Sequence, residues 1–186
     1  MNLDAGFKIS WNAPVVPGAS LAGIPLGVCS NVLMDRLNHY MVDYNNNVCK
    51  FHNSPELRLI TQGLDAFGNG SYSFFLFDDA VVNKLLKNFP ALYIAIREWS
   101  VFAIKVYDFS FPGEAAQALR YRGELPSGHG LGDLVSELKK FADLEFDDAE
   151  EWFFGSCEYD GLEVTGWGVP LEDRPDQIIT ALCVLS

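Results

Sequence analysis

The sequence lacks a long run of apolar residues. A membrane-spanning helix needs roughly 18 of them in succession, and Arg97, Glu98, Lys105 and Asp108 interrupt the longest apolar strings. Residues 1–8 also lack the basic stretch followed by an apolar one that is typical of an export signal. We therefore expect a soluble, cytoplasmic protein that does not bind a membrane.

Cysteine and histidine are scarce as well. The chain has only three histidines and no Cys-x-x-Cys pair, so the spacing predicts neither a metal site nor disulfides. We expect reduced, mostly buried thiols. No Gly-Lys-Ser/Thr sequence follows the glycines of residues 128–132, and their spacing is not that of a dinucleotide-binding loop, so no cofactor is predicted. The cysteines are Cys29, Cys49, Cys157 and Cys183.

Basic residues are almost absent from the last quarter of the chain. Residues 1–140 contain 13 acidic and 12 basic residues, whereas residues 141–186 contain 12 acidic residues and one basic residue, Arg174. Nearly all of the formal net charge of −12 therefore belongs to this last segment. Such a field repels nucleic acid and anionic membranes and favours a cationic partner.

The composition indicates one folded domain that spans residues 1–186. With 49% apolar and 13% aromatic residues, the chain can bury a core without disulfides or metals. Alternating apolar and polar residues, and one continuous apolar run near the end, predict strands. We expect Phe102, Ile104 and Val106 to share one face of their strand. The expected strands cover residues 48–51, 57–62, 71–77, 91–99, 101–108, 119–123, 162–165 and 176–185.

A glycine-rich loop at residues 128–132 predicts a turn into a helix. We expect Asp133 to cap that helix, with Leu134, Leu138 and Phe141 on its buried side. Together with the strands, this predicts an α+β fold in which helices pack on a mostly antiparallel sheet.

A similar loop and helix occur earlier in the chain. Gly23 and Gly27 precede a segment in which Ser30 is the expected cap and Leu33 and Leu37 lie on one face. This echo suggests a divergent duplication of a helix-plus-hairpin unit, with pseudo-repeats at residues 1–78 and 79–186. Residues 80–88 fit either a helix or an edge strand, and the two alternatives stay open.

Few residues are arranged as catalytic groups usually are. Ser127 and His129 share one glycine loop, and no carboxylate is evidently placed to orient the imidazole, so we expect His129 to be a loop histidine. The acidic run at residues 147–151 lacks the calcium-loop pattern. Its carboxylates fit a solvated face or, as an alternative function, the site of a hydrolase or other small-ligand enzyme.

Aromatic residues are mixed with the acidic ones near the end of the chain. Binding surfaces often place aromatic anchors at their centre and complementary charge around them. We therefore expect a partner-binding surface for a basic protein. Its predicted residues are Asp143, Glu145, Asp147, Asp148, Glu150, Glu151, Trp152, Glu158, Tyr159 and Asp160.

Several short motifs occur in an order found in one group of proteins. They are Tyr121-x-Gly123, Gly128-x-Gly130-Leu131-Gly132-Asp133-x-Val135-Ser136-Glu137-Leu138, Phe146-Asp147-Asp148-x-Glu150-Glu151-Trp152 and Asp160-Gly161-Leu162. This order resembles bacterial immunity proteins of polymorphic toxin systems, including contact-dependent growth inhibition.

The resemblance implies a cytoplasmic antidote that is not an enzyme. Such a protein binds the C-terminal domain of its cognate toxin and blocks the active site or the path of the substrate. The matching motif positions are scaffold residues, so the expected contacts rest on charge. A nuclease-like toxin fits best, because a protein that binds phosphates presents Lys and Arg to an acidic inhibitor.

Overall fold

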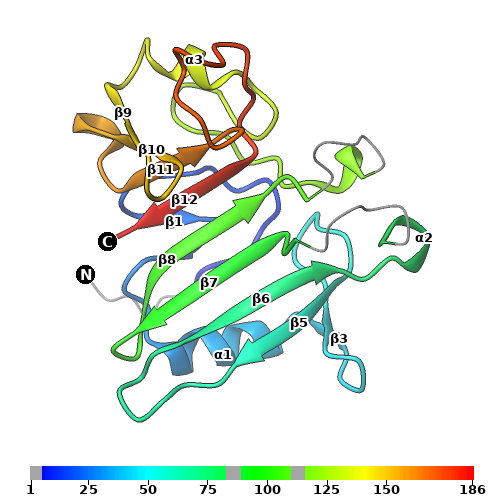
Figure 1. Cartoon of the computed structure of the whole chain (residues 1–186). Helices are drawn as coiled ribbons and strands as arrows, with labels where there is room; N and C mark the ends of the chain where they lie inside the picture. Colours follow the sequence, from blue (N-terminus) through cyan, green and yellow to red (C-terminus); the bar gives the residue numbers. More distant parts are fainter. Residues whose placement is uncertain (1–5, 83–88, 110–115) are drawn as a thin grey trace.

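A computed structural model describes residues 6–82, 89–109 and 116–186 (Figure 1). Its main feature is a ten-stranded sheet in which all neighbouring strands are antiparallel. This confirms the expected mixed fold with a large antiparallel sheet. In sheet order, the strands are Met41–Asp43 (β3), Val48–Cys49 (β4), Leu57–Gln62 (β5), Gly70–Leu76 (β6), Leu92–Arg97 (β7), Ser100–Tyr107 (β8), Ala181–Leu185 (β12), Leu162–Thr165 (β11), Trp152–Gly155 (β10) and Leu144–Asp147 (β9).

The β7–β8 hairpin lies at the centre of the sheet, and an arm of four strands extends from each side of it (Figure 1). We call β3 to β6 the first arm and β9 to β12 the second arm. Within each arm the strands follow one another in sequence order. The second arm joins the centre through β12, in which Leu182 pairs with Val106 of β8 on one side and with Val164 of β11 on the other.

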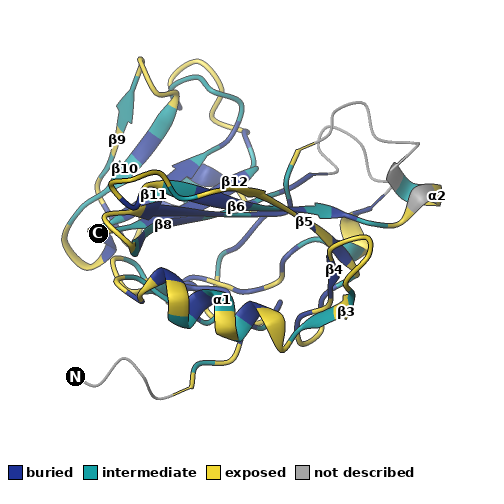
Figure 2. Cartoon of the chain, turned by 90° about the horizontal axis from the view of Figure 1, so that it is seen from below, coloured by how far each residue is buried: buried dark blue, intermediate teal, exposed yellow. Residues whose placement is uncertain are grey.

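One face of the sheet forms the hydrophobic core. Alternate residues of the central strands, such as Ile94 and Ile104, are fully buried there. Helix α1 (Ser30–Asn38) contributes Leu33 and Leu37 to the same core. Figure 2 shows α1 on one side of the sheet, while β9 and β10 rise on the other side. A short hairpin, β1 (Ser20–Leu21) and β2 (Ile24–Pro25), also contributes to the core, and its β1 contacts β8 and β12.

The start of α1 differs from our prediction. Its capping position is Cys29, which makes no side-chain hydrogen bond to the helix. Ser30 is instead the first helical residue, and its buried hydroxyl has no hydrogen-bond partner. The prediction of a Ser30 cap was therefore wrong, because the helix begins one residue earlier than the serine pattern suggested.

The helix after the glycine loop is a single turn, α3 (Val135–Leu138). Asp133 does not cap it, because the Asp133 carboxylate accepts a hydrogen bond from the backbone N–H of Gly130 at 2.8 Å. Val135 and Leu138 are buried, whereas Leu134 and Phe141 are 39% and 48% exposed. The predicted cap and buried stripe were therefore wrong in part, and the fold has less helix than we expected.

Two further segments can be compared with the predictions from the sequence. The expected strand at residues 119–123 is wrong: Leu119 ends a short 3₁₀ helix, Gln117–Leu119, and residues 120–123 are irregular chain outside the sheet. For residues 80–88, the first part belongs to the helix α2 (Asp79–Val82), and residues 83–88 lie outside the described residues.

The structure also places the four cysteines. All are free thiols; Cys49 and Cys183 are buried, whereas Cys29 and Cys157 are exposed. Burial is thus confirmed for two of the four. Among the described residues, no helix combines the length and the apolar character needed to cross a membrane.

Candidate partner-binding surface

The second face of the central sheet, which we call the open face, carries small residues ringed by larger ones. Ala95, Ala103 and Cys183 are buried at its middle. Four partly buried side chains pack around them: Tyr93, Phe102, Trp152 and Leu185. An apolar patch of this kind on a sheet face is typical of an interaction surface.

A groove of about 640 Å³ lies at one side of the open face. Residues from β8, β12, the end of β11 and the turn between β9 and β10 line it. Its aromatic lining includes Tyr107, Trp152 and Trp167, and Glu150 and Glu151 also contribute. The groove therefore combines aromatic walls with exposed carboxylates.

Two aromatic rings of this groove contact cations of the same chain. The Lys105 ammonium lies 4.5 Å from the centre of the Trp152 ring and 3.9 Å from a Glu163 carboxylate oxygen. The Arg174 guanidinium carbon lies 4.0 Å from the centre of the Trp167 ring. Both indoles thus present a face to positive charge, which the electron-rich ring attracts.

Hydrogen bonds hold the acidic turn between β9 and β10. The Asp147 carboxylate accepts from the backbone N–H groups of Ala149 and Glu150, at 2.7 and 3.1 Å. The Thr165 hydroxyl donates to the Glu151 carbonyl at 2.9 Å, which ties the turn to β11. The Asp147 side chain therefore shapes the turn, while Glu150 and Glu151 are exposed.

The backbone of Glu151 has a positive φ of 62°. Glutamate seldom adopts this conformation, which favours Gly and Asn. Beside it, a Cβ added to Gly168 would lie 2.8 Å from a Glu151 carboxylate oxygen, so Gly168 leaves room for this side chain. A strained acidic residue at the edge of a groove is often a sign of function.

The structure divides the predicted surface residues into two groups. Near the groove lie the turn residues Asp147, Asp148, Glu150, Glu151 and Trp152. At the other end of the β9–β10 hairpin, roughly 13 Å away for four strand residues, lie Asp143, Glu158, Tyr159 and Asp160. Glu145 lies between the groups, opposite Phe154.

Tyr159 does not belong on the surface. Its side chain is only 3% exposed and packs in the core, whereas Glu158 and Asp160 on either side are exposed. A short 3₁₀ turn, Cys157–Tyr159, directs the ring inward. We therefore leave Tyr159 out of the proposed surface.

The groove residues that the predicted surface left out include Lys105, Tyr107 and Trp167. Lys105 and Tyr107 alternate with the core residues Ile104 and Val106, so their place on the other face was visible in the pattern. The sequence does not show that Lys105 and Tyr107 lie near the acidic turn, because this proximity depends on the insertion of β12 beside β8.

Burial raises the pKa of the Tyr107 hydroxyl to about 12, and the nearby Cys183 and Tyr93 add to this effect. Burial also raises the pKa of the Cys183 thiol to about 12. Both groups therefore stay protonated near neutral pH. Tyr107 can form hydrogen bonds in the groove, whereas Cys183 is not poised to act as a thiolate nucleophile.

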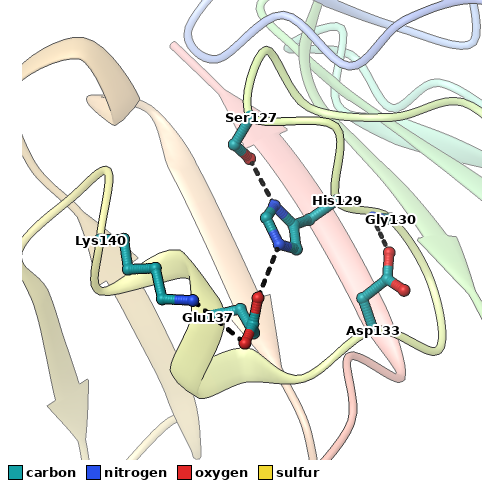
Figure 3. A network of polar contacts seen from close by, with 6 residues as sticks. All are labelled: Ser127, His129, Gly130, Asp133, Glu137 and Lys140. Carbon is teal, nitrogen blue, oxygen red and sulfur yellow. Dashed lines mark hydrogen bonds and ion pairs between the residues drawn. The ribbon is translucent and has the colours of Figure 1, made fainter.

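A second polar cluster lies in the glycine loop before α3 (Figure 3). His129 Nδ1 lies 3.1 Å from Ser127 Oγ, and His129 Nε2 lies 3.4 Å from a Glu137 carboxylate oxygen. Our expectation that no carboxylate orients this imidazole was therefore wrong. Glu137 is eight residues further on, and the single turn of α3 brings it back to the loop.

This Ser–His–Glu chain has the composition of a catalytic triad but a different setting. The Lys140 ammonium lies 3.2 Å from Glu137, and hydrogen bonds from Lys140 and then His129 hold the pKa of Glu137 below its ordinary 4.5. A neighbouring cavity of about 490 Å³ has none of Ser127, His129 or Glu137 in its lining. The cluster fits a structural role, in which it links the loop to α3.

Among the described residues, no three His, Cys, Asp or Glu side chains lie close enough together to hold a metal ion. Comparisons of the chain with protein families, curated proteins and solved structures found no match. The features of the molecule that bear on function are therefore the groove, the acidic turn and the short motifs.

Proposed function

We propose that this chain is an immunity protein that binds and neutralises the C-terminal domain of a cognate, cationic toxin. The observation that carries the proposal is the meeting of acidic and aromatic residues at one groove: Glu150 and Glu151 lie beside Trp152 on the open face. Partly buried aromatic residues supply anchors for a partner, and the surrounding charge selects its sign.

The charge distribution supports a basic partner. The second arm belongs to the segment with 12 acidic residues and one basic residue. Electrostatic steering can raise association rates to about 10⁸–10⁹ M⁻¹s⁻¹, and it weakens as salt shortens the Debye length to about 8 Å. A nuclease-like toxin, with a basic surface for phosphates, is the class that fits this field best.

An enzyme with a carboxylate site in this region has less support. A carboxylate that acts as a general acid near neutral pH needs burial or a close like charge to raise its pKa. Glu150 and Glu151 are exposed, and the Asp147 carboxylate is occupied by backbone N–H groups of the turn. These features favour a binding surface over an acid–base pair.

The order of elements also supports the proposed duplication. A helix precedes a run of four antiparallel strands twice, α1 before β3 to β6 and α3 before β9 to β12. We infer that the two arms descend from one unit, in which case the partner-binding charge was acquired by the second arm alone.

The first experiment is to co-express this chain with the C-terminal domain of the protein encoded directly upstream. We expect cells to survive only when both are present, and the two proteins to co-purify. Survival without this chain, or the absence of a complex, would contradict the proposal.

A variant pair then tests the surface. Glu150→Gln/Glu151→Gln removes two charges at the groove, and Glu172→Gln/Asp173→Asn removes two exposed charges that do not line it. We expect the first variant to lower the association rate and its salt dependence more than the second. Equal effects would mean that only net charge matters.

A further inference from the structure

We propose that the groove receives an arginine side chain, stacked on indole rings and paired with the turn carboxylates. This inference rests on the proposed function, because it names the chemistry by which a toxin domain would be recognised. The residues that form this arginine site are Tyr107, Trp152, Trp167, Glu150 and Glu151.

The size and walls of the groove suit such a ligand. A volume of about 640 Å³ is enough for a long side chain and its neighbouring backbone. The Trp152 and Trp167 rings already attract cationic groups of the chain itself, at 4.5 and 4.0 Å from the ring centres. An arginine from a partner would replace that cation or stack on the opposite face of the ring. The aromatic walls therefore favour a cation over an anion.

The charged groups at the groove also favour a cationic ligand. Lys105 lines the groove next to Trp152, and its ammonium lies 3.9 Å from the Glu163 carboxylate. Arg174, over the Trp167 ring, is paired with Asp176 at 3.3 Å. Asp108, at the edge, is paired with Arg120 at 3.1 Å. The carboxylates of Glu150 and Glu151 remain in excess, so a ligand with a positive charge restores the balance.

Arginine fits this combination better than lysine. Its guanidinium is planar, so it can stack on an indole while its edge donates two parallel hydrogen bonds to a carboxylate. A lysine ammonium can lie over a ring and near a carboxylate, as Lys105 does, but it is not planar and cannot donate that pair of parallel hydrogen bonds. The Tyr107 hydroxyl, which stays protonated, supplies a further hydrogen-bonding group at the same groove.

The four tryptophans provide a direct test. We would record the indole N–H signals of the isolated protein by NMR, assign them with Trp→Phe variants, and titrate a hexa-arginine peptide. We expect the Trp152 and Trp167 signals to shift. Trp11, 1% exposed, and Trp99, 48% exposed at the tip of the β7–β8 hairpin, serve as internal controls.

Matched peptides and variants sharpen the result. Hexa-lysine should bind more weakly than hexa-arginine, and hexa-glutamate should produce no shift. Glu150→Gln/Glu151→Gln should weaken hexa-arginine binding about fivefold, as expected for two partly exposed ion pairs, and Glu172→Gln/Asp173→Asn should have less effect. A Trp99 shift as large as that of Trp152, or equal losses in the two variants, would overturn the proposal.

The two proposals can fail separately. If hexa-arginine shifts the groove signals but the upstream toxin domain is not neutralised, the arginine site stands and the immunity function is wrong. If the toxin is neutralised but the groove signals do not respond to hexa-arginine, the toxin binds in another way.

Discussion

The first turns of the two arms have the same backbone and different side chains. In residues 43–48 and 147–152, the carboxylate of the first residue accepts hydrogen bonds from the backbone N–H groups two and three positions later. The distances are 2.9 and 3.2 Å for Asp43, and 2.7 and 3.1 Å for Asp147. Each turn also contains one residue with a positive φ, Asn47 at 53° and Glu151 at 62°.

The difference lies in which side chains the turn carries. In the first arm, three asparagines follow Tyr44, and asparagine suits such turns because it tolerates a positive φ. In the second arm the turn holds Asp148, Glu150 and Glu151, and glutamate is poorly suited to that conformation. The first turn has a sequence that favours folding, whereas the second departs from it at the groove. A departure of this kind is expected where function, not stability, determines the residue.

The largest effect is expected from substitutions in the core, which test whether the two arms unfold together or independently. Leu33→Ala in α1 and Leu138→Ala in α3 each remove a fully buried side chain next to one arm. Because both leucines belong to one continuous core cluster, each change should lower the free energy of unfolding by about 2–5 kcal/mol. We expect one cooperative urea transition in both variants. Two separate transitions in either variant would show that the arms unfold independently.

A smaller effect compares one buried thiol from each arm at alkaline pH. Burial raises the pKa of Cys49 in β4 and of Cys183 in β12 to about 12, whereas the same thiols ionise near pH 9 in the unfolded chain. Their contribution to stability is therefore complete below pH 9 and is lost as the pH rises toward 12. Each thiol should steepen the fall of the free energy of unfolding by up to about 1.4 kcal/mol per pH unit.

The measurement is urea unfolding between pH 8 and 10.5 on Cys49→Ala, Cys183→Ala and the unchanged protein. The cavity that each substitution leaves lowers stability at every pH, so the slope against pH is the quantity to compare. Both variants should have a shallower slope above pH 9. Unchanged slopes would mean that thiol ionisation does not contribute.

The smallest effect is expected when the two residues with positive φ are exchanged between the turns. Glu151→Asn should raise the free energy of unfolding by about 1 kcal/mol, because asparagine is less strained in this conformation, and Asn47→Glu should lower it by about the same amount. Thermal or urea unfolding measures both. We also expect Glu151→Asn to weaken binding of the toxin domain, while Asn47→Glu leaves it unchanged. If Glu151→Asn stabilises the protein and binding of the toxin domain is unchanged, Glu151 is not part of the partner-binding surface.

Much of the sheet was predictable from local patterns. Alternation identified β5, β7 and β11, because burial on one face leaves a period of two in the sequence. Nearly continuous apolar runs identified β6 and β12, because burial on both faces removes that period. The pattern failed at Phe102. The register of β7 and β8 shifts between Ala95 and Ile96, which places Phe102 on the open face while Ile104 and Val106 stay in the core.

Other features depend on contacts between distant residues. Nothing local shows that α3 ends after one turn, nor that β12 inserts between β8 and β11. The charge of the acidic turn was visible in the sequence, but its groove was not, since Tyr107 and Trp167 reach it only through that insertion. Glu137 was likewise missed as the partner of His129, because spacing alone does not reveal how a short helix turns back on its loop.

The position of β12 has a consequence for synthesis on the ribosome. The first arm and the central hairpin can pair strand by strand as they emerge, because each strand lies beside the previous one. In the second arm, β9, β10 and β11 emerge before β12, the strand that connects them to β8. Until β12 is made, this acidic arm has no strand of the centre to pair with, so we expect it to be the last part of the nascent chain to fold and the part most exposed to proteolysis during translation.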